Sequence, residues 1–117
     1  MKSKVNWQPS ASIDALIQRS AIIQNIRAFF FERDFIEIET PLLASYGVTD
    51  PYNENFTCDY FGKPYFLQTS PEYHLKRLLC AGAPNLFQLS KAFRYEMTSK
   101  HHNPEFTMLE WYRKGFT

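Results

Sequence analysis

The chain has 117 residues, which is one small domain or part of one, and a chain of this size can bury a modest core. It contains 11 Phe and 7 Tyr, so its composition excludes an intrinsically disordered chain. The formal net charge of +1 gives no basic footprint of the kind that nucleic-acid-binding proteins carry.

Two further features of the composition bear on the cellular context. No apolar run approaches the roughly 18 residues of a membrane span, and the polar start Met1-Lys2-Ser3-Lys4 lacks the apolar segment of a signal peptide. Cys58 and Cys80 lack CxxC spacing and a matching His pair, so we expect no metal site and no disulfide framework. These observations predict a cytoplasmic protein without a membrane partner.

The first predicted element is a helix over residues 13–33. Ser12 can cap it, and Asp14 in the first turn suits the helix dipole. Apolar residues recur at helical spacing and predict one apolar stripe: Ile13, Leu16, Ile17, Ile23, Ile26 and Phe30. The pattern alone favours a core helix that packs on a sheet over a helix in an interface.

Short strands follow this helix. Residues 35–39 alternate between apolar and acidic side chains, which predicts a strand that ends at Pro41 or lies at a sheet edge. Residues 42–54 form a polar loop. Residues 56–60 and 65–68 then predict a hairpin that turns at Gly62-Lys63-Pro64.

The segment Thr69-Ser70-Pro71-Glu72 reads as the start of a second helix. Ser70 fits the N-cap and Pro71 the first helical position, while Gly82 marks the end. Leu75, Leu78 and Leu79 give the helix an apolar face, and we expect Lys76 and Arg77 to be solvated. From local sequence alone, an ordinary helix start is the favoured interpretation.

Residues 93–112 predict two strands joined by a polar loop. Side chains alternate between the faces of a strand, so Arg94 and Glu96 share a face. One face of the return strand carries Phe106, Met108, Glu110 and Tyr112. The other face carries Leu109 and Trp111, which we expect in the core.

The face that carries Phe106 and Glu110, together with Arg94, suits a pocket better than a core. Arg94 can donate two parallel hydrogen bonds to a phosphate. Phe106 offers a flat ring on which a purine can stack, and Glu110 offers a charge to an ammonium group. The alternative is an amphipathic hairpin with one solvated face.

The residues Phe93-Arg94-Tyr95-Glu96 and His102-Asn103-Pro104-Glu105-Phe106-Thr107-Met108-Leu109-Glu110 resemble motif 2 of class II aminoacyl-tRNA synthetases, in the lysyl form. The ending Glu110-Trp111-Tyr112-Arg113 is more similar to the branch of that family that attaches β-lysine to elongation factor P. Such a long ordered match is far more specific than a three-residue signature.

The resemblance implies an α+β fold, namely the N-terminal part of a class II catalytic domain with an antiparallel sheet flanked by helices. Motif 1 would span about residues 20–41 and form a homodimer interface, and motif 2 would span about 86–112. Residues 1–117 would then be an incomplete domain without motif 3 and without an anticodon-binding domain. We therefore expect the isolated chain to be inactive.

The resemblance also implies the site residues. Arg94 would be catalytic, bridging the substrate carboxylate and the α-phosphate of ATP. The ATP-binding residues would be Arg94, Tyr95, Glu96, His102, Asn103 and Phe106. The substrate-binding residues would be Ser70, Pro71, Glu72, Glu110 and Tyr112. Tyr95 departs from the small polar residue that is common at this place in the family.

The implied activity is that of a ligase, which activates lysine or β-lysine as an adenylate and transfers it to a lysine of elongation factor P. ATP and Mg²⁺ would be the cofactors, with the metal ligands outside this chain. The alternatives are a lysyl-tRNA synthetase fragment that charges tRNA, which the absence of a basic patch disfavours, and a truncated paralogue that acts as a binding or dimerisation module. An amide-forming relative of the class II fold is a further alternative.

Overall fold

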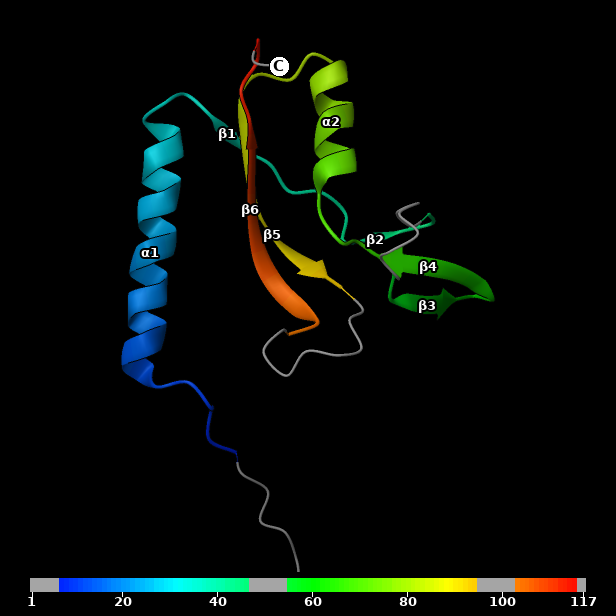
Figure 1. The fold of residues 1–117 in the computed structure, drawn as a ribbon, viewed down its shortest axis with the longest axis horizontal. Helices are drawn as coiled ribbons and strands as arrows, with labels where there is room; N and C mark the ends of the chain where they lie inside the picture. The colour runs from blue at the N-terminus through cyan, green and yellow to red at the C-terminus, as the bar shows by residue number, and fades with distance from the viewer. Residues whose placement is uncertain (1–6, 47–54, 95–102, 116–117) are drawn as a thin grey trace, which may run out of the picture. The chain divides into compact units, whose positions relative to one another are not determined.

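The computed structural model describes residues 7–46, 55–94 and 103–115. The chain forms two compact units, Met1–Arg33 and Asp34–Thr117. Figure 1 shows the helices and strands along the chain.

The first unit consists of helix α1, Ile13–Phe31. The predicted cap is confirmed, since the Oγ atom of Ser12 accepts a hydrogen bond of 3.0 Å from the backbone N–H of Ala15. The helix ends two residues earlier than expected. Asp34 has a positive φ of 62°, and this left-handed conformation belongs to the turn that follows the helix.

The predicted apolar stripe of α1 is only partly buried. Phe30 is buried, and Ile23 and Ile26 are intermediate. The side chains near the N-terminal end are exposed instead, with 65% of Ile13 and 61% of Ile17 accessible. Other apolar residues lie outside the stripe and are also exposed: Ile22, Phe29 and Phe31. The helix therefore has apolar side chains around much of its circumference rather than on one face.

In the second unit, one sheet has the strand order β1-β5-β6, with β1 at Ile36–Glu37, β5 at Leu86–Phe93 and β6 at Glu105–Tyr112. Strands β5 and β6 are antiparallel over their full length, from Leu86 opposite Tyr112 to Phe93 opposite Glu105. The return strand is therefore as predicted, whereas the first strand ends at Phe93 instead of beginning there, and residues 95–102 lie outside the described residues. The expected antiparallel pairing is thus present, and the short strand β1 adds a parallel pair with β5, so this sheet is mixed.

The other sheet has the order β2-β4-β3, with β2 at Leu43–Ala44, β3 at Thr57–Tyr60 and β4 at Lys63–Leu67. The hairpin is confirmed, but its turn is Phe61-Gly62 rather than Gly62-Lys63-Pro64. Both turn residues have positive φ (52° and 79°), which matches a two-residue turn with the twist of the flanking strands. Pro64 instead lies within β4, opposite Asp59.

Helix α2, Glu72–Cys80, lies alongside the β1-β5-β6 sheet (Figure 1). Its N-cap is Pro71, one residue later than expected, and the Oγ atom of Ser70 accepts a 3.3 Å hydrogen bond from the N–H of Glu72. The predicted end is confirmed, since Gly82 takes a φ of +97°. Leu75 from the predicted apolar face is fully buried.

Backbone hydrogen bonds of Gln68 place the start of α2 next to the end of β5. The N–H of Gln68 donates to the carbonyl of Leu42 at 2.9 Å, and its carbonyl accepts from the N–H of Phe93 at 3.0 Å. Because Gln68 bonds to segments of both sheets, the residues just after it begin α2 beside Phe93 and Arg94.

We expect Leu75→Ala to destabilise the protein by about 2–5 kcal/mol, because it removes a fully buried side chain and leaves a cavity. Urea unfolding of wild type and variant measures this difference. Leu43→Ala is the matched control: 41% of Leu43 is exposed, and we expect a loss of less than about 1 kcal/mol. Equal losses for the two variants would contradict the placement of Leu75 in the core.

Candidate functional site

Four residues of β6 share one face of the sheet, as the sequence alternation predicts. Phe106, Met108, Glu110 and Tyr112 are all partly buried. On the other face Leu109 is also partly buried, but 53% of Trp111 is exposed. The prediction of Trp111 as a core residue is therefore wrong, since alternation tells which residues share a face but not which face is covered.

The neighbouring strand β5 contributes two buried polar side chains to the same face. Gln88 lies opposite Glu110 and Ser90 opposite Met108, and these two β5 residues are only 2% and 6% exposed. The Oγ1 atom of Thr40 donates a 2.9 Å hydrogen bond to the Oε1 atom of Gln88. The sequence interpretation missed Gln88 and Thr40, although a glutamine within a largely apolar strand is a usable signal. The hydrogen bond satisfies both buried side chains, as is usual for polar groups inside a protein.

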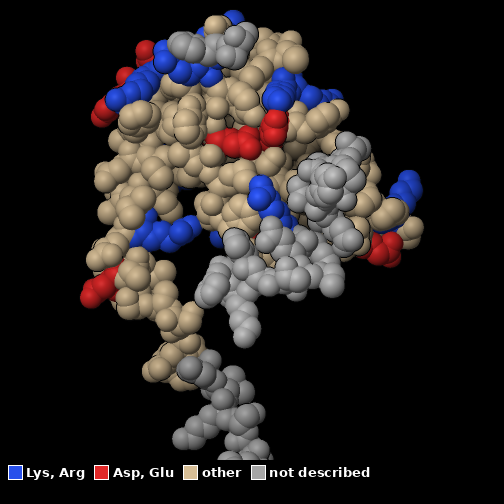
Figure 2. Space-filling model, viewed as in Figure 1, with Lys and Arg blue, Asp and Glu red and all other residues tan. Residues whose placement is uncertain are grey.

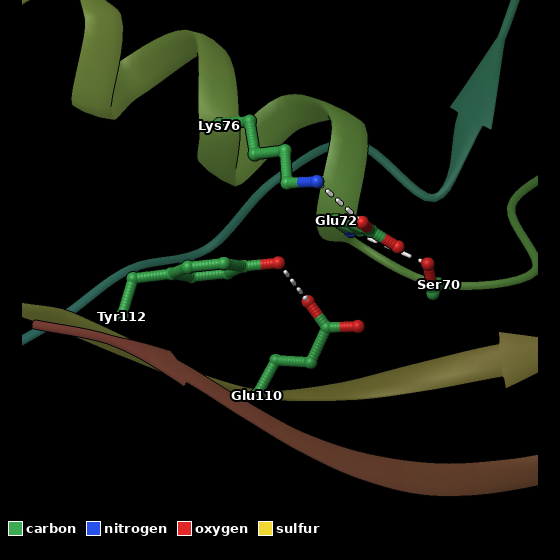
Figure 3. A network of polar contacts seen from close by, with 5 residues as sticks. All are labelled: Ser70, Glu72, Lys76, Glu110 and Tyr112. Atoms are coloured by element: carbon green, nitrogen blue, oxygen red, sulfur yellow. Dashed lines mark hydrogen bonds and ion pairs between the residues drawn. The ribbon is translucent and has the colours of Figure 1, made fainter. Parts of the chain in front are cut away.

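Glu110 and Tyr112 point from this face toward the first turn of α2, where Glu72 and Lys76 lie (Figure 3). The Oη atom of Tyr112 donates a 3.4 Å hydrogen bond to Glu110 Oε2. The Nζ atom of Lys76 lies 2.6 Å from Glu72 Oε1. Two carboxylates that are 38 residues apart in the sequence, one on α2 and one on β6, thus face one another. The structure brings together Ser70, Glu72, Glu110 and Tyr112 of the predicted substrate residues (Figure 3).

The electrostatics of this cluster favour a bound cation. Burial raises the pKa of the Glu110 carboxyl, and the negative charge of Glu72 raises it further. Burial, followed by the charges of Glu110 and Glu72, raises the pKa of Tyr112 to about 12. Its phenol is therefore neutral at pH 7. Because the charge of Glu72 disfavours the ionised form of Glu110, an ammonium group placed between the two carboxylates would be favourable.

Lys76 is exposed, as expected, and it also forms an ion pair that the sequence interpretation did not include. Its side chain is 58% exposed, but the ammonium forms an ion pair with Glu72. The hydrogen bond to Glu72 is the main reason why the pKa of Lys76 is raised, with a smaller contribution from Glu110. The spacing of four residues between Glu72 and Lys76 was the sequence signal for this pair.

Arg94 and Phe106 lie close together at the other end of the β5–β6 pair. Arg94 follows the last residue of β5 and is exposed, and its N–H donates to the carbonyl of Pro104 at 2.9 Å. The guanidinium carbon lies 5.5 Å from the centre of the Phe106 ring. Asn103 is exposed just before β6. These three residues provide a cation, an aromatic ring and an amide.

Other predicted site residues have different outcomes. Pro71 is buried at the start of α2. Tyr95, Glu96 and His102 lie outside the described residues. In the described ranges no group of three or more His, Cys, Asp or Glu side chains is arranged to hold a metal ion. Cys58 and Cys80 are both free thiols, and both are exposed.

Two features of the described residues bear on binding to membranes and to polyanions. None of the helices in the described part of the chain is both long and apolar enough to cross a membrane. On the face in Figure 2, the Lys and Arg side chains are separated by neutral surface and by Asp and Glu side chains. This view therefore shows basic groups that are dispersed rather than gathered.

Residues 4–116 match the family of tRNA synthetases class II (D, K and N). The chain belongs to the class II tRNA synthetase family. Its helices and its antiparallel pairs β5–β6, β3–β4 and β2–β4 give this class II chain the expected α+β content.

Several curated relatives named elongation factor P–(R)-β-lysine ligase are similar to this class II chain. The protein of Haemophilus ducreyi is 51% identical over 120 residues, covering 97% of the chain and 37% of the relative. That of Haemophilus influenzae strain PittGG is 53% identical over 117 residues, with 95% and 36% covered. That of Vibrio campbellii is 49% identical over 119 residues, with 97% and 37% covered. The chain thus spans little more than a third of these relatives.

Proposed function

We propose that the complete protein activates lysine or β-lysine as an adenylate, with ATP, and transfers it to a lysine of elongation factor P. The observation that carries this proposal is the pair of facing carboxylates, Glu72 on α2 and Glu110 on β6, beside the neutral phenol of Tyr112. Lysine and β-lysine each carry two amino groups, so two carboxylates suit them. The acceptor, elongation factor P, is inferred from the names of relatives at about 50% identity.

In this proposal each of the two carboxylates binds one of the two amines of the substrate. Glu72 binds the α- or β-amino group, next to the reacting carboxylate, and Ser70 and Pro71 shape that end of the site. Glu110 and Tyr112 bind the ammonium at the far end of the side chain. A ligand that lacks one amine leaves a carboxylate without its partner, and such unpaired groups give strong discrimination.

The ATP end of the site is assigned to motif 2, which we place at about residues 86–112. Arg94 binds the substrate carboxylate and the α-phosphate, because a guanidinium can donate parallel hydrogen bonds to both anions. Phe106 stacks on adenine, and Asn103 hydrogen-bonds near it. We assign Tyr95, Glu96 and His102 to the same nucleotide by resemblance.

Class II ligases in general use Mg²⁺ together with ATP. The described residues hold no cluster of metal-binding side chains, so they do not fit a resident Mg²⁺ site. We therefore propose that the metal ligands lie in the part of the relatives that this chain does not span.

We also propose that α1 and β1 belong to motif 1, at about residues 20–41, and that the protein is a homodimer through this segment. The exposed apolar side chains of α1 support this proposal, since monomeric proteins rarely leave large apolar patches in water. Motif 3 and the rest of the catalytic domain are assigned to the part of the relatives that this chain does not span.

The acceptor can be tested in a chimera, in which residues 1–117 replace the matching part of the full-length Haemophilus influenzae relative. With radiolabelled β-lysine and ATP, we expect label on elongation factor P and little on tRNA. Elongation factor P with its acceptor lysine changed to arginine is the control and should stay unlabelled. Efficient charging of tRNA with no labelled factor would favour the lysyl-tRNA synthetase alternative. A chimera that forms no adenylate would favour the binding-module alternative.

A further inference from the structure

The ammonium of Lys76 pairs with Glu72, the carboxylate that we assign to the α- or β-amino group of the substrate. This group is called the near amine, and the ammonium at the end of the side chain is called the far amine. Its Nζ atom lies 2.6 Å from Glu72 Oε1, and the pair points toward Glu110 and Tyr112 (Figure 3). Residues four apart on a helix lie on the same face, so Lys76 reaches Glu72 without any change in the backbone. A substrate amine that approaches Glu72 therefore meets an ammonium that is already there.

The substrate amine and the ammonium of Lys76 would compete for Glu72, and the charges of the cluster determine the strength of this competition. Glu72 and Glu110 contribute two negative charges, Lys76 contributes one positive charge, and Tyr112 is neutral at pH 7 because its pKa is about 12. Lysine brings two ammonium groups to a cluster whose net charge is −1. Arg77, the next cation on α2, lies with its guanidinium carbon 6.0 Å from the ring centre of Tyr73. It is not one of the residues of this cluster (Figure 3).

We propose that Lys76 is a specificity-determining residue, whose ammonium occupies the Glu72 carboxylate in the free protein and is displaced by the α- or β-amino group of the substrate. This inference rests on the proposed assignment of Glu72 to that amine. Both side chains are more than half exposed, and exposed pairs on a helix surface are weak. The displacement therefore costs little, while a ligand without the near amine cannot bring it about.

A purely structural role for Lys76 predicts the opposite result. If Lys76 served only to hold Glu72 in position, its removal would loosen the carboxylate and weaken amine binding. If Lys76 competes with the amine, its removal frees the carboxylate and also removes a repelling charge. The sign of the change in affinity thus separates the two roles.

The test compares two ligands on the chimera. Lysine carries both amines, whereas 6-aminohexanoate carries only the far amine. We expect Lys76→Met to lower the dissociation constant for lysine by about three- to fivefold, since it removes a charge that repels the near amine and competes for Glu72. We expect a change of less than about twofold for 6-aminohexanoate, whose amine binds at Glu110. Calorimetry measures both constants.

Two matched variants complete the series. Arg77→Met removes a positive charge from the next position of α2, and we expect it to change neither constant by more than about twofold. Lys76→Arg keeps the charge beside Glu72 and should restore affinities close to wild type. Methionine is a good helix former, so circular dichroism should show an intact helix in Lys76→Met. Unchanged or weaker lysine binding in Lys76→Met would overturn the inference.

Glu72→Gln separates this inference from the proposed function. We expect it to weaken lysine binding by more than about tenfold and to leave 6-aminohexanoate nearly unaffected, because only lysine loses a charged partner. If lysine binding does not change, the assignment of Glu72 fails, and the role of Lys76 fails with it. If Glu72→Gln weakens lysine but Lys76→Met does not tighten it, only the inference about Lys76 fails.

Discussion

Arg94→Ala in the chimera should lower the rate of adenylate formation by roughly 10²–10³-fold, which is the usual loss when one preorganised donor to a transition state is removed. Arg94 lies at the end of β5, exposed and next to Phe106, where its guanidinium is available to an anion. ATP–pyrophosphate exchange with saturating lysine measures the effect. Arg94→Lys should recover little, because an ammonium cannot donate two parallel hydrogen bonds in a fixed plane.

Lys91→Ala provides the control for the removal of a positive charge from β5. Lys91 is exposed and lies opposite Thr107, on the face of the sheet away from Glu110. We expect its exchange rate to stay within about twofold of wild type, since exposed surface substitutions rarely have larger effects. Equal losses in Arg94→Ala and Lys91→Ala would show that the general charge of the strand matters rather than a contact of Arg94.

The parts of the fold that follow from local chemistry were predictable from the sequence. Ser12 and Gly82 marked a helix start and a helix end because a hydroxyl can cap and glycine accepts positive φ. Alternation placed Glu110 and Tyr112 on one face of β6. Parallel pairing of β1 with β5 depends on residues about 50 positions apart, and no local pattern encodes it.

In the candidate site, too, local patterns predicted single residues but not the contacts between elements. The sequence supplied Glu110 and Tyr112 by alternation, and Glu72 by resemblance, but it did not bring the helix and the strand together. Trp111 was misassigned because the burial of a face depends on what covers it. The pair of Lys76 with Glu72 could have been predicted from their spacing of four residues on one helix, but its position beside Glu110 could not. The proximity of Glu72, Lys76 and Glu110 becomes visible only in three dimensions (Figure 3).

Glu110→Gln should cost about 2–5 kcal/mol in the activation of lysine, because the far ammonium of the substrate loses its charged partner in a partly buried site. At 1.4 kcal/mol per tenfold change, this equals a loss of roughly 30- to 4,000-fold in kcat/KM. Pyrophosphate exchange on the chimera measures it. Glu105→Gln is the matched control, since Glu105 is an exposed residue of the same strand and lies on its other face. Exchange that is unaffected in Glu110→Gln would remove Glu110 from the site.

The same substitution should stabilise the protein when no ligand is bound. The pKa of Glu110 is raised in the folded state, so the folded protein holds this proton more tightly than the unfolded chain does. Stability therefore falls as the pH rises from the ordinary value of 4.5 through the raised value, and the ionised carboxylate is unfavourable at neutral pH. Glutamine carries no charge and keeps an oxygen that can accept from Tyr112.

We expect the Tm of Glu110→Gln to lie above that of wild type at pH 7, and the difference to vanish as the pH falls below 4.5, where both side chains are neutral. Thermal unfolding across this pH range measures it, with Glu105→Gln as the control. Saturating lysine should reverse the order at pH 7, since the ligand stabilises the wild type and binds the variant poorly. A variant that is less stable at pH 7 without ligand would show that Glu110 serves the fold rather than the binding of a cation.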